Sequence, residues 1–453
     1  MELFGSSGIR GVALRYLTPE LVLDIAKAAG TTWDADRVAV ARDTRTTGEL
    51  FANAAASGLA AVGCDVDRLG VVPTPAVGQY CESAGVPCVL VTASHNPPEF
   101  NGIKLVGDDG VELSVDVLER IERRVLDDDY DHTDWHGAGT TTRVEGVVDD
   151  YAAQLIDAVD REAIADAGLT VAVDPGHGAA STSSPRIYRE LGCDVVTVNA
   201  TPDGHFPGRE SEPVPENLTA LSRLVATGEA DVGIAHDGDA DRAVFVDESG
   251  AVIDGDTSFA ALADAALNPG DAVVSAVNVS QRLVDVCADN DADLELTPIG
   301  ATNIITRTRE LYAEDVHVPI AGEGNGGVFF PPYRLSRDGA YIGAKFLELL
   351  AAADGPASEV VAPYTDYHFV RVNVEYDDGD EREDMLSAAR AYVETSAATP
   401  NTTDGYRLDY GDAWVLVRPS GTEPKIRIYA ESADADRAER LAEEMRHAVE
   451  SGR

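Results

Sequence analysis

One apolar run of the chain ends in side chains that could carry out phosphoryl or acyl transfer. Residues 88–91 are apolar and rich in β-branched types, which predicts a buried strand. Polar residues, including Ser94 and His95, follow before the breaker pair at 97–98. Because open α/β sheets bind ligands at the carboxyl ends of strands, Ser94 is a candidate nucleophile with His95 beside it. The alternative is an ordinary strand-to-loop turn.

Three carboxylates recur at every second position in a short loop. Asp237, Asp239 and Asp241 would repel one another unless a hard cation lay between them, so Mg²⁺ is the expected occupant. A calcium-binding loop is a competing interpretation, because Glu248 falls at its twelfth position. Arg242 stands where that loop requires glycine, and the flanks have β-branched strand sequence instead of helical sequence. A solvated acidic turn is the remaining alternative.

A third polar loop, residues 418–425, separates two apolar runs near the carboxyl end of the chain. A guanidinium, two hydroxyls and backbone N–H groups at this spacing are typical of a phosphate-binding loop. The candidate phosphate contacts are Arg418, Ser420, Gly421, Thr422 and Arg427. The alternative is a plain hairpin turn.

Two glycine-rich segments add candidates for ligand binding. Residues 322–327 contain Glu323 and Asn325, which could hydrogen-bond to the vicinal hydroxyls of a sugar. Residues 4–11 contain Arg10, whose guanidinium could contact a phosphate. Lysine is scarce, with four in the whole chain, and both Lys104 and Lys425 lie beside the polar loops.

The elements that must position these residues follow a strand–helix rhythm. Thr18 is followed by proline, a combination that predicts the start of a helix, and we expect this helix to end at Gly30. Residues 37–41 read as a strand, residues 42–48 as a polar turn and residues 49–62 as an alanine-rich helix. The same alternation recurs twice more, so we expect an α/β protein.

The final part of the chain has a different, α+β order. We expect a strand at 366–376, a helix at about 381–396, strands at 415–417 and 426–429, and a last helix capped near Ser432. An acidic stretch, 127–146, reads as a linker. The predicted domains are 1–147, 148–250, 251–360 and 361–453.

Composition limits the possible functions. The 453 residues include 80 acidic and 35 basic side chains, for a net charge of −45, which disfavours nucleic-acid binding and indicates a salt-rich cytosol. No apolar run is long enough to span a membrane and no signal pattern opens the chain, so we expect a cytoplasmic protein. The five cysteines include no C-x-x-C pair, which indicates reduced thiols instead of disulfides or a zinc site.

Together the polar loops resemble the α-D-phosphohexomutase family. The resemblance covers essentially the whole chain, with four motifs in family order, at residues 92–97, 237–242, 322–327 and 418–424. It implies that Ser94 carries the phosphoryl group, that Ser94 and the three aspartates bind one Mg²⁺, and that Arg242 lies beside the phosphoserine. The other two motifs correspond to the sugar-binding loop and the phosphate-binding loop.

This family's fold is three similar α/β domains plus a C-terminal α+β domain around a central cleft. The implied activity is the interconversion of hexose 6-phosphate and hexose 1-phosphate through a phosphoserine enzyme and a 1,6-bisphosphate intermediate. Partners would be hexose phosphates, with a monomer or homodimer as the assembly. Other hypotheses are a silent sugar-phosphate-binding protein and a phosphatase that uses a phosphoserine.

Two departures limit what the resemblance implies. Asn325-Gly-Gly327 stands where many bacterial members have Ser-Gly-His, a pattern more like archaeal members, so glucosamine phosphate is favoured over mannose or glucose phosphate. Ala301 stands where relatives often have a charged or imidazole group. The general acid/base is therefore unassigned, with His95, Lys104 and Arg10 as catalytic candidates.

Overall fold

The computed structural model describes residues 3–5, 8–353, 355–420 and 424–453. It divides into two compact units, each of which uses two stretches of the chain. The first unit is Met1–Ser258 with Asn325–Val360, and the second is Phe259–Gly324 with Val361–Arg453.

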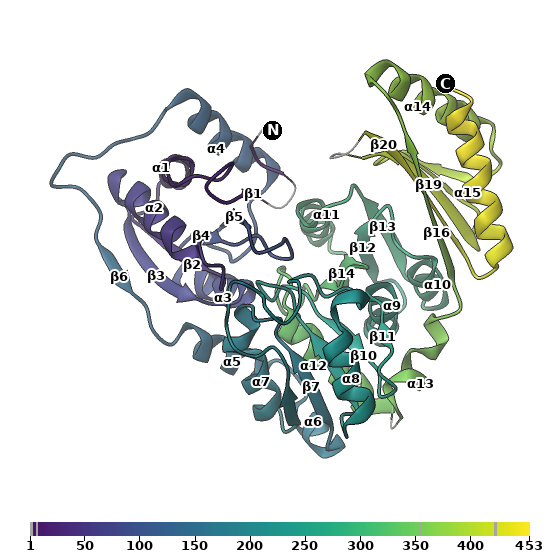
Figure 1. The fold of residues 1–453 in the computed structure, drawn as a ribbon, viewed down its shortest axis with the longest axis horizontal. Coiled ribbons are helices and arrows are strands. Elements are labelled where there is room, and N and C mark those ends of the chain that lie inside the picture. Colours follow the sequence, from purple (N-terminus) through teal and green to yellow (C-terminus); the bar gives the residue numbers. More distant parts are fainter. Residues whose placement is uncertain (1–2, 6–7, 354, 421–423) are drawn as a thin grey trace. The chain divides into compact units, whose positions relative to one another are not determined.

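The amino-terminal part of the first unit is built on a six-stranded sheet of order β1-β5-β4-β2-β3-β6 (Figure 1). Strands β6, β3, β2 and β4 run parallel, whereas β5 and β1 are antiparallel to their neighbours. The strands are β1 (Ile9–Val12), β2 (Arg37–Arg42), β3 (Asp65–Val71), β4 (Cys88–Val91), β5 (Phe100–Val106) and β6 (Thr141–Arg143). The helices are α1 (Pro19–Trp33), α2 (Gly48–Ala61), α3 (Thr74–Ala84) and α4 (Val115–Asp127). Helix α1 packs against α2 and α4.

The start of α1 is as predicted, but its end is not. The Thr18 side chain accepts a hydrogen bond from the Leu21 N–H and so caps the helix. The helix then runs through Gly30 and ends where Asp34 adopts a left-handed conformation. A Cβ at Gly30 would lie 2.8 Å from Cγ2 of Val62, so this glycine allows close packing and does not terminate the helix.

A second sheet, of order β11-β10-β9-β7-β8, completes the core of the first unit. Its strands are β7 (Thr170–Asp174), β8 (Asp194–Thr197), β9 (Val232–Ala235), β10 (Val244–Val246) and β11 (Val252–Ile253). The other elements of the first unit are α5 (Val147–Asp157), α6 (Arg161–Ala167), η1 (Ala179–Thr182), α7 (Ser184–Glu190), η2 (Pro215–Asn217), α8 (Thr219–Thr227), β15 (Gly327–Phe329) and α12 (Gly339–Ala353). Phe346 of α12 stacks on Phe245 of β10, with ring centroids 4.0 Å apart.

The second unit contains a parallel β13-β12-β14 arrangement and a separate antiparallel sheet of order β16-β20-β19-β18-β17 (Figure 1). Its strands are β12 (Ala272–Ala276), β13 (Asp293–Thr297), β14 (Ile320–Glu323), β16 (His368–Glu375), β17 (Thr399–Asn401), β18 (Tyr406–Asp409), β19 (Ala413–Pro419) and β20 (Lys425–Ser432). The helices are α10 (Gln281–Asp289), α11 (Ala301–Ala313), η3 (Ala362–Tyr364), α14 (Gly379–Thr395) and α15 (Ala435–Glu450), while α9 (Gly255–Ala266) and α13 (Ala357–Val361) cross the boundaries between the units. Helices α14 and α15 contact each other and pack on the antiparallel sheet.

The α/β class and the change to α+β at the carboxyl end are confirmed, but two local predictions are wrong besides the end of α1. Strands β17 and β18 were not predicted, and the segment read as a linker contains β6. The last helix is capped close to Ser432, as expected, by Asp434, whose carboxylate accepts the Arg437 N–H. The five cysteines are buried and unpaired. Among the described residues, no helix is both long and apolar enough to cross a bilayer.

Candidate active site

Ser94 lies at the carboxyl end of β4, as the apolar run before it predicts. The side chain is fully buried, and the backbone is in the left-handed region with φ of 50°. Its Oγ donates a 2.6 Å hydrogen bond to Oδ2 of Asp237. Asp237 lies in the loop between β9 and β10, so the two sheets of the first unit contribute one residue each to this contact.

The three aspartates form a cluster in which one oxygen of each makes no hydrogen bond to the described residues. Asp237, Asp239 and Asp241 are fully or almost fully buried, and one carboxylate oxygen of each lies within 4.8 Å of the others. The Oδ1 atom of all three is buried and has no hydrogen-bond partner in the described part of the chain. Unpaired buried carboxylate oxygens are costly, and three that converge fit a hard divalent cation with oxygen ligands. The cluster is therefore a site that could bind a metal ion.

The outer oxygens of two aspartates are held by residues from distant parts of the first unit. Lys104 Nζ lies 3.0 Å from Oδ2 of both Asp239 and Asp241. Thr74 Oγ1 donates to Asp239 at 2.7 Å, and Arg337 Nη2 donates to Asp241 at 2.7 Å. Sequence analysis named Lys104 but missed Thr74 and Arg337. These partners hold one oxygen of each of the two carboxylates in place.

The charges divide unevenly over the cluster. Burial, together with repulsion from Asp239 and Asp241, raises the pKa of Asp237 to about 8. Burial acts in the same direction on Asp241, but Arg337 and Lys104 outweigh it and hold the pKa of that carboxyl below its usual range. Asp237 thus lacks a close cationic partner, since Arg242 Nε is 3.9 Å away. A bound cation would supply the missing positive charge.

Arg242 and His95 lie together beside the Ser94 loop. Arg242 Nη2 is 3.1 Å from His95 Nδ1. Because a guanidinium only donates, Nδ1 is the acceptor and the ring proton is on Nε2. Burial, together with the positive charges of Arg242 and Arg10, lowers the pKa of His95 to about 3. Arg10 donates from Nη1 to Oδ1 of Asn96 at 3.1 Å, so it also lies at this loop.

At this loop each of the two arginines has one donor atom that makes no hydrogen bond to the described residues. The Nε atoms of Arg10 and Arg242 are buried and have no hydrogen-bond partner among the described residues. Two such donors beside a serine hydroxyl are suited to bind phosphoryl oxygens. The structure therefore brings together all the predicted catalytic and metal residues, namely Ser94, His95, Arg10, Lys104, Arg242, Asp237, Asp239 and Asp241.

The calcium-binding interpretation of the aspartate loop is excluded by its surroundings. Strands β9 and β10 flank the loop, where a calcium hand has helices. Glu248, the predicted twelfth ligand, instead accepts hydrogen bonds from the amide and hydroxyl of Ser358.

The predicted sugar and phosphate residues are distributed differently. Glu323 belongs to the second unit and Asn325 to the first, where its Oδ1 accepts the Gly327 N–H at 3.0 Å. Their role in sugar binding stays a prediction.

The phosphate-binding prediction meets a competing contact. Arg418 pairs with Asp404 through two contacts, Nε to Oδ1 at 3.2 Å and Nη2 to Oδ2 at 3.1 Å. Arg427 lies opposite Arg418 in the β19–β20 register, and the Ser420 N–H closes the hairpin on the Lys425 carbonyl at 2.8 Å. Gly421 and Thr422 lie outside the described residues. The role of this loop in phosphate binding stays a prediction.

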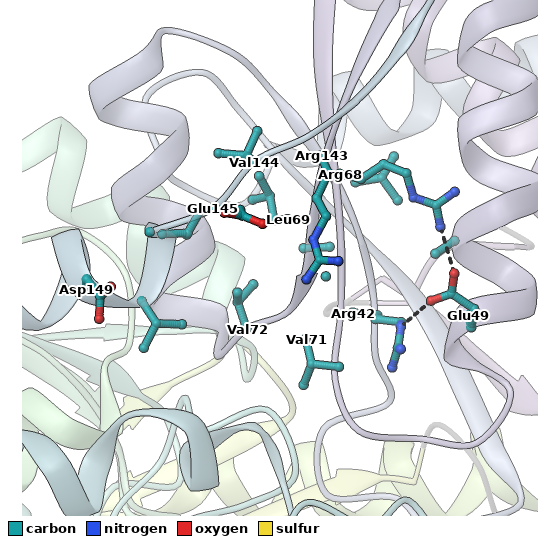
Figure 2. Close-up of a pocket in the computed structure, with 17 residues that line it drawn as sticks. Arg42, Glu49, Arg68, Leu69, Val71, Val72, Arg143, Val144, Glu145 and Asp149 are labelled. Atoms are coloured by element: carbon teal, nitrogen blue, oxygen red, sulfur yellow. Dashed lines mark hydrogen bonds and ion pairs between the residues drawn. The ribbon is translucent and has the colours of Figure 1, made fainter.

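A pocket of about 700 Å³ lies away from the aspartate cluster, along the carboxyl ends of β2, β3 and β6 (Figure 2). Glu49 bridges Arg42 and Arg68 there, with contacts of 3.0 and 3.3 Å. The charged residues of the lining are Arg42, Arg68, Arg143, Glu49, Glu145 and Asp149. Three positive and three negative side chains cancel in formal charge, so the pocket has no excess charge to attract an anionic substrate.

Four family models match consecutive parts of the chain. They are the phosphoglucomutase/phosphomannomutase α/β/α domains I, II and III, over residues 1–132, 149–250 and 254–367, and the C-terminal domain over 370–448. A phosphoglucomutase/phosphomannomutase of Thermococcus kodakarensis is 39% identical over 98% of this chain and 97% of its own length. A probable phosphoglucosamine mutase of Methanopyrus kandleri is 38% identical over 97% of this chain and 96% of its own.

The structure is also similar to a solved one of the same family. A phosphoglucomutase/phosphomannomutase family protein of Burkholderia thailandensis superimposes with a TM-score of 0.86 at 27% identity, over 99% of this chain and 97% of that protein. The four motifs, the four matched domains and the full-length relatives agree with one another. The chain therefore belongs to the phosphoglucomutase/phosphomannomutase family, the α-D-phosphohexomutases that its motifs resemble.

Proposed function

We propose that this chain is a phosphohexomutase that interconverts hexose 6-phosphate and hexose 1-phosphate, with Ser94 as the phosphoryl carrier. The observation that carries the proposal is the buried 2.6 Å contact of Ser94 Oγ with Asp237, one of three aspartates whose Oδ1 atoms have no hydrogen-bond partner among the described residues. A serine hydroxyl aimed at a divalent-cation site is suited to carry a phosphoryl group.

In the first transfer the P–Oγ bond of phosphorylated Ser94 breaks and a P–O bond to the free sugar hydroxyl forms, with the hydroxyl proton passing by way of a base to Ser94 Oγ. In the second transfer a sugar P–O bond breaks and the P–Oγ bond forms again, with the Oγ proton passing back to the sugar oxygen. Ser94 and the three aspartates would hold Mg²⁺, which when bound neutralises charge on the phosphoryl oxygens. Arg10 and Arg242 would donate to the same oxygens through their Nε atoms, which have no hydrogen-bond partner among the described residues. The resulting 1,6-bisphosphate then returns its other phosphate to Ser94.

The base of this step is unassigned among His95, Lys104 and Arg10. Lys104 is the less suited, because its ammonium group is committed to Asp239 and Asp241. Burial lowers the pKa of Lys104, but the two carboxylates outweigh this effect and raise it above its usual value.

A mutase must retain its bisphosphate, and we assign that task to the loop with Arg418, Ser420, Gly421, Thr422 and Arg427. Glu323 and Asn325 would bind the sugar hydroxyls. A second phosphate-binding site of this kind distinguishes a mutase from a phosphatase, which releases its product after one transfer. This chain offers such a loop in the β19–β20 hairpin, where two arginines face each other in register.

Glucosamine phosphate is the preferred substrate in this proposal. The relative from Methanopyrus kandleri is named a probable phosphoglucosamine mutase, and the Asn325-Gly-Gly327 sequence resembles archaeal members. The alternative is mannose or glucose phosphate, which the name of the Thermococcus kodakarensis relative favours. The proposed setting is a salt-rich cytoplasm, with the protein as a monomer or homodimer.

One assay tests the activity and the sugar together. Turnover of glucosamine-, mannose- and glucose-6-phosphates is measured in molar KCl with Mg²⁺ and a trace of the matching 1,6-bisphosphate. We expect all turnover to require Ser94 and glucosamine-6-phosphate to have the highest kcat/KM. Release of inorganic phosphate without the 1-phosphate would indicate a phosphatase. Binding of all three without turnover would indicate a silent binding protein.

A further inference from the structure

Arg45 lies in the polar turn after β2, and its side chain makes several hydrogen bonds to the Ser94 loop. We propose that Arg45 is the positioning residue that holds the phosphoserine loop in the shape needed for transfer. This inference rests on the proposed phosphoserine function. It assigns a role to the segment 42–48, through Arg45, that the mechanism above does not include.

The guanidinium of Arg45 donates hydrogen bonds to four main-chain carbonyls of the loop. Arg45 is 1% exposed. Its Nη2 donates to the carbonyls of Ser94 at 2.8 Å and Asn96 at 2.6 Å. Its Nη1 donates to those of Pro97 at 2.6 Å and Phe100 at 2.9 Å. The loop from 94 to 100 is therefore wrapped around one planar group.

Asp43 links this clamp to the other side of the Ser94 backbone. Arg45 Nε donates to Asp43 Oδ2 at 3.1 Å. The Thr92 hydroxyl donates to the same oxygen at 2.7 Å and accepts the Ser94 N–H at 2.9 Å. The network thus fixes the N–H of Ser94 through Thr92 and its C=O through Arg45. A fully connected buried network of this kind makes one geometry strongly preferred.

The loop needs such support because Ser94 has a positive φ of 50°. A side chain in this region crowds the backbone, and a residue stays there only when its surroundings hold it. The strained backbone directs Oγ at Asp237, 2.6 Å away. Loss of the clamp would let the loop relax and turn the hydroxyl away from the aspartates.

A loop of the second sheet braces Arg45 from behind. A Cβ on Gly204 would lie 2.6 Å from Cα of Arg45, so only glycine allows this approach. The ring of Phe206 lies over the guanidinium, 5.2 Å from its centre. Ser211 Oγ donates to the Asn96 carbonyl at 2.9 Å, which adds a bond to one of the clamped carbonyls. The guanidinium thus has an aromatic ring against its face.

Lysine cannot replace this group, because its donors radiate from one atom and cannot reach four separated carbonyls in a plane. The chain also provides a matched control three residues earlier, at the last residue of β2. The Arg42 side chain is 22% exposed, pairs with Glu49 and donates to the Asp43 carbonyl at 3.2 Å. In the described part of the chain it makes no side-chain hydrogen bond to residues 92–100. Arg42→Lys and Arg45→Lys are thus the same chemical change at positions three residues apart.

The test compares wild type, Arg42→Lys and Arg45→Lys in molar KCl. We expect Arg45→Lys to lower kcat about 100-fold, as for a misplacement of about 1 Å, with little change in KM. Hydrogen exchange of a peptide that covers residues 92–101 should be faster in Arg45→Lys, while Arg42→Lys should match wild type in all three measurements.

A second pair covers the case in which Arg45→Lys fails to fold. Thr92→Val removes both bonds of the Thr92 hydroxyl with little change in shape, and Thr92→Ser restores the hydroxyl. We expect low kcat and fast exchange in the first and recovery of both in the second.

Two results would overturn the proposal. One is wild-type kcat and exchange in Arg45→Lys. The other is a lower melting temperature with unchanged kcat per folded molecule, which would indicate a purely structural role. The exchange measurement does not depend on turnover. If wild type had no mutase activity the proposed function would fail, and the difference in exchange would still decide the role of Arg45.

Discussion

Ser94 and Asp237 are 143 residues apart in the sequence and meet at 2.6 Å in the structure. In this contact a neutral hydroxyl donates to the Asp237 carboxyl group. Burial, together with repulsion from Asp239 and Asp241, raises the pKa of that group to about 8. Phosphorylation removes that donor and sets a dianionic group beside three carboxylates. The charge change makes a divalent cation more necessary in the phosphorylated form, so we expect phosphoryl transfer and metal binding to be coupled.

Ser94 should carry phosphate in part of the purified protein, and Ser94→Ala should lower kcat by several orders of magnitude because the covalent carrier is lost. Intact mass and peptide mapping identify the modified residue. Ser57→Ala, at an exposed helix position, serves as the control and should retain full activity. Phosphate found reproducibly on another serine would contradict the assignment.

Asp239→Asn should reduce activity strongly and weaken the dependence on Mg²⁺. The change removes one of three ligand charges, and it leaves Lys104 with one fewer carboxylate partner. Activity is measured across a Mg²⁺ titration and in EDTA. Asp108→Asn changes an exposed carboxyl on the same unit and should behave as wild type. Full wild-type activity in EDTA would show that the metal has no role.

Local sequence predicts an element well where a cap or an apolar run is its strongest determinant, as at Thr18 and in residues 88–91. It fails where packing decides. Gly30 lies inside α1 because the helix needs its small size against Val62. Strand β17 was missed because its three residues, Thr399–Asn401, are mostly exposed and include a proline, which leaves no apolar pattern to detect.

The site was predictable where several functional residues share one short segment, as in the aspartate loop from Asp237 to Asp241. Single residues contributed by distant elements gave no comparable signal. Arg337 reaches Asp241 across 96 positions of sequence, and Thr74 reaches Asp239 across 165. Arg45 stood in a turn that sequence analysis did identify, but its contacts depend on the three-dimensional course of the loop at 94–100.

Stability should fall at low salt. The net charge of −45 makes the carboxylates repel one another. The Debye length, beyond which such repulsion is screened, is about 3 Å at 1 M salt and about 30 Å at 0.01 M. We expect the melting temperature to rise steeply with KCl, measured by thermal unfolding from dilute to molar salt. Sorbitol at matched osmolarity is the uncharged control. A flat profile with KCl would remove the inference of a salt-rich cytosol.

The last prediction concerns Arg418, whose guanidinium is paired with Asp404 by two contacts in this structure. If the guanidinium binds the non-reacting phosphate, the phosphate must replace Asp404 as its partner. Arg418→Ala should then raise KM for the 6-phosphate and the 1-phosphate alike, because the bisphosphate presents either phosphate to the same group. It should also make turnover more dependent on added 1,6-bisphosphate, since the intermediate escapes before its second transfer.

Two companion variants separate this role from that of a surface ion pair. Arg437→Ala breaks an exposed pair with Asp412 in the same sheet-bearing unit and should leave both KM values unchanged, because such pairs contribute only about 0–1 kcal/mol. Asp404→Asn removes the carboxylate that competes with the phosphate, so KM should fall or stay constant. A KM increase in Asp404→Asn equal to that in Arg418→Ala would show that the pair itself is required. An effect of Arg418→Ala on one substrate alone would contradict a grip shared by both orientations of the bisphosphate.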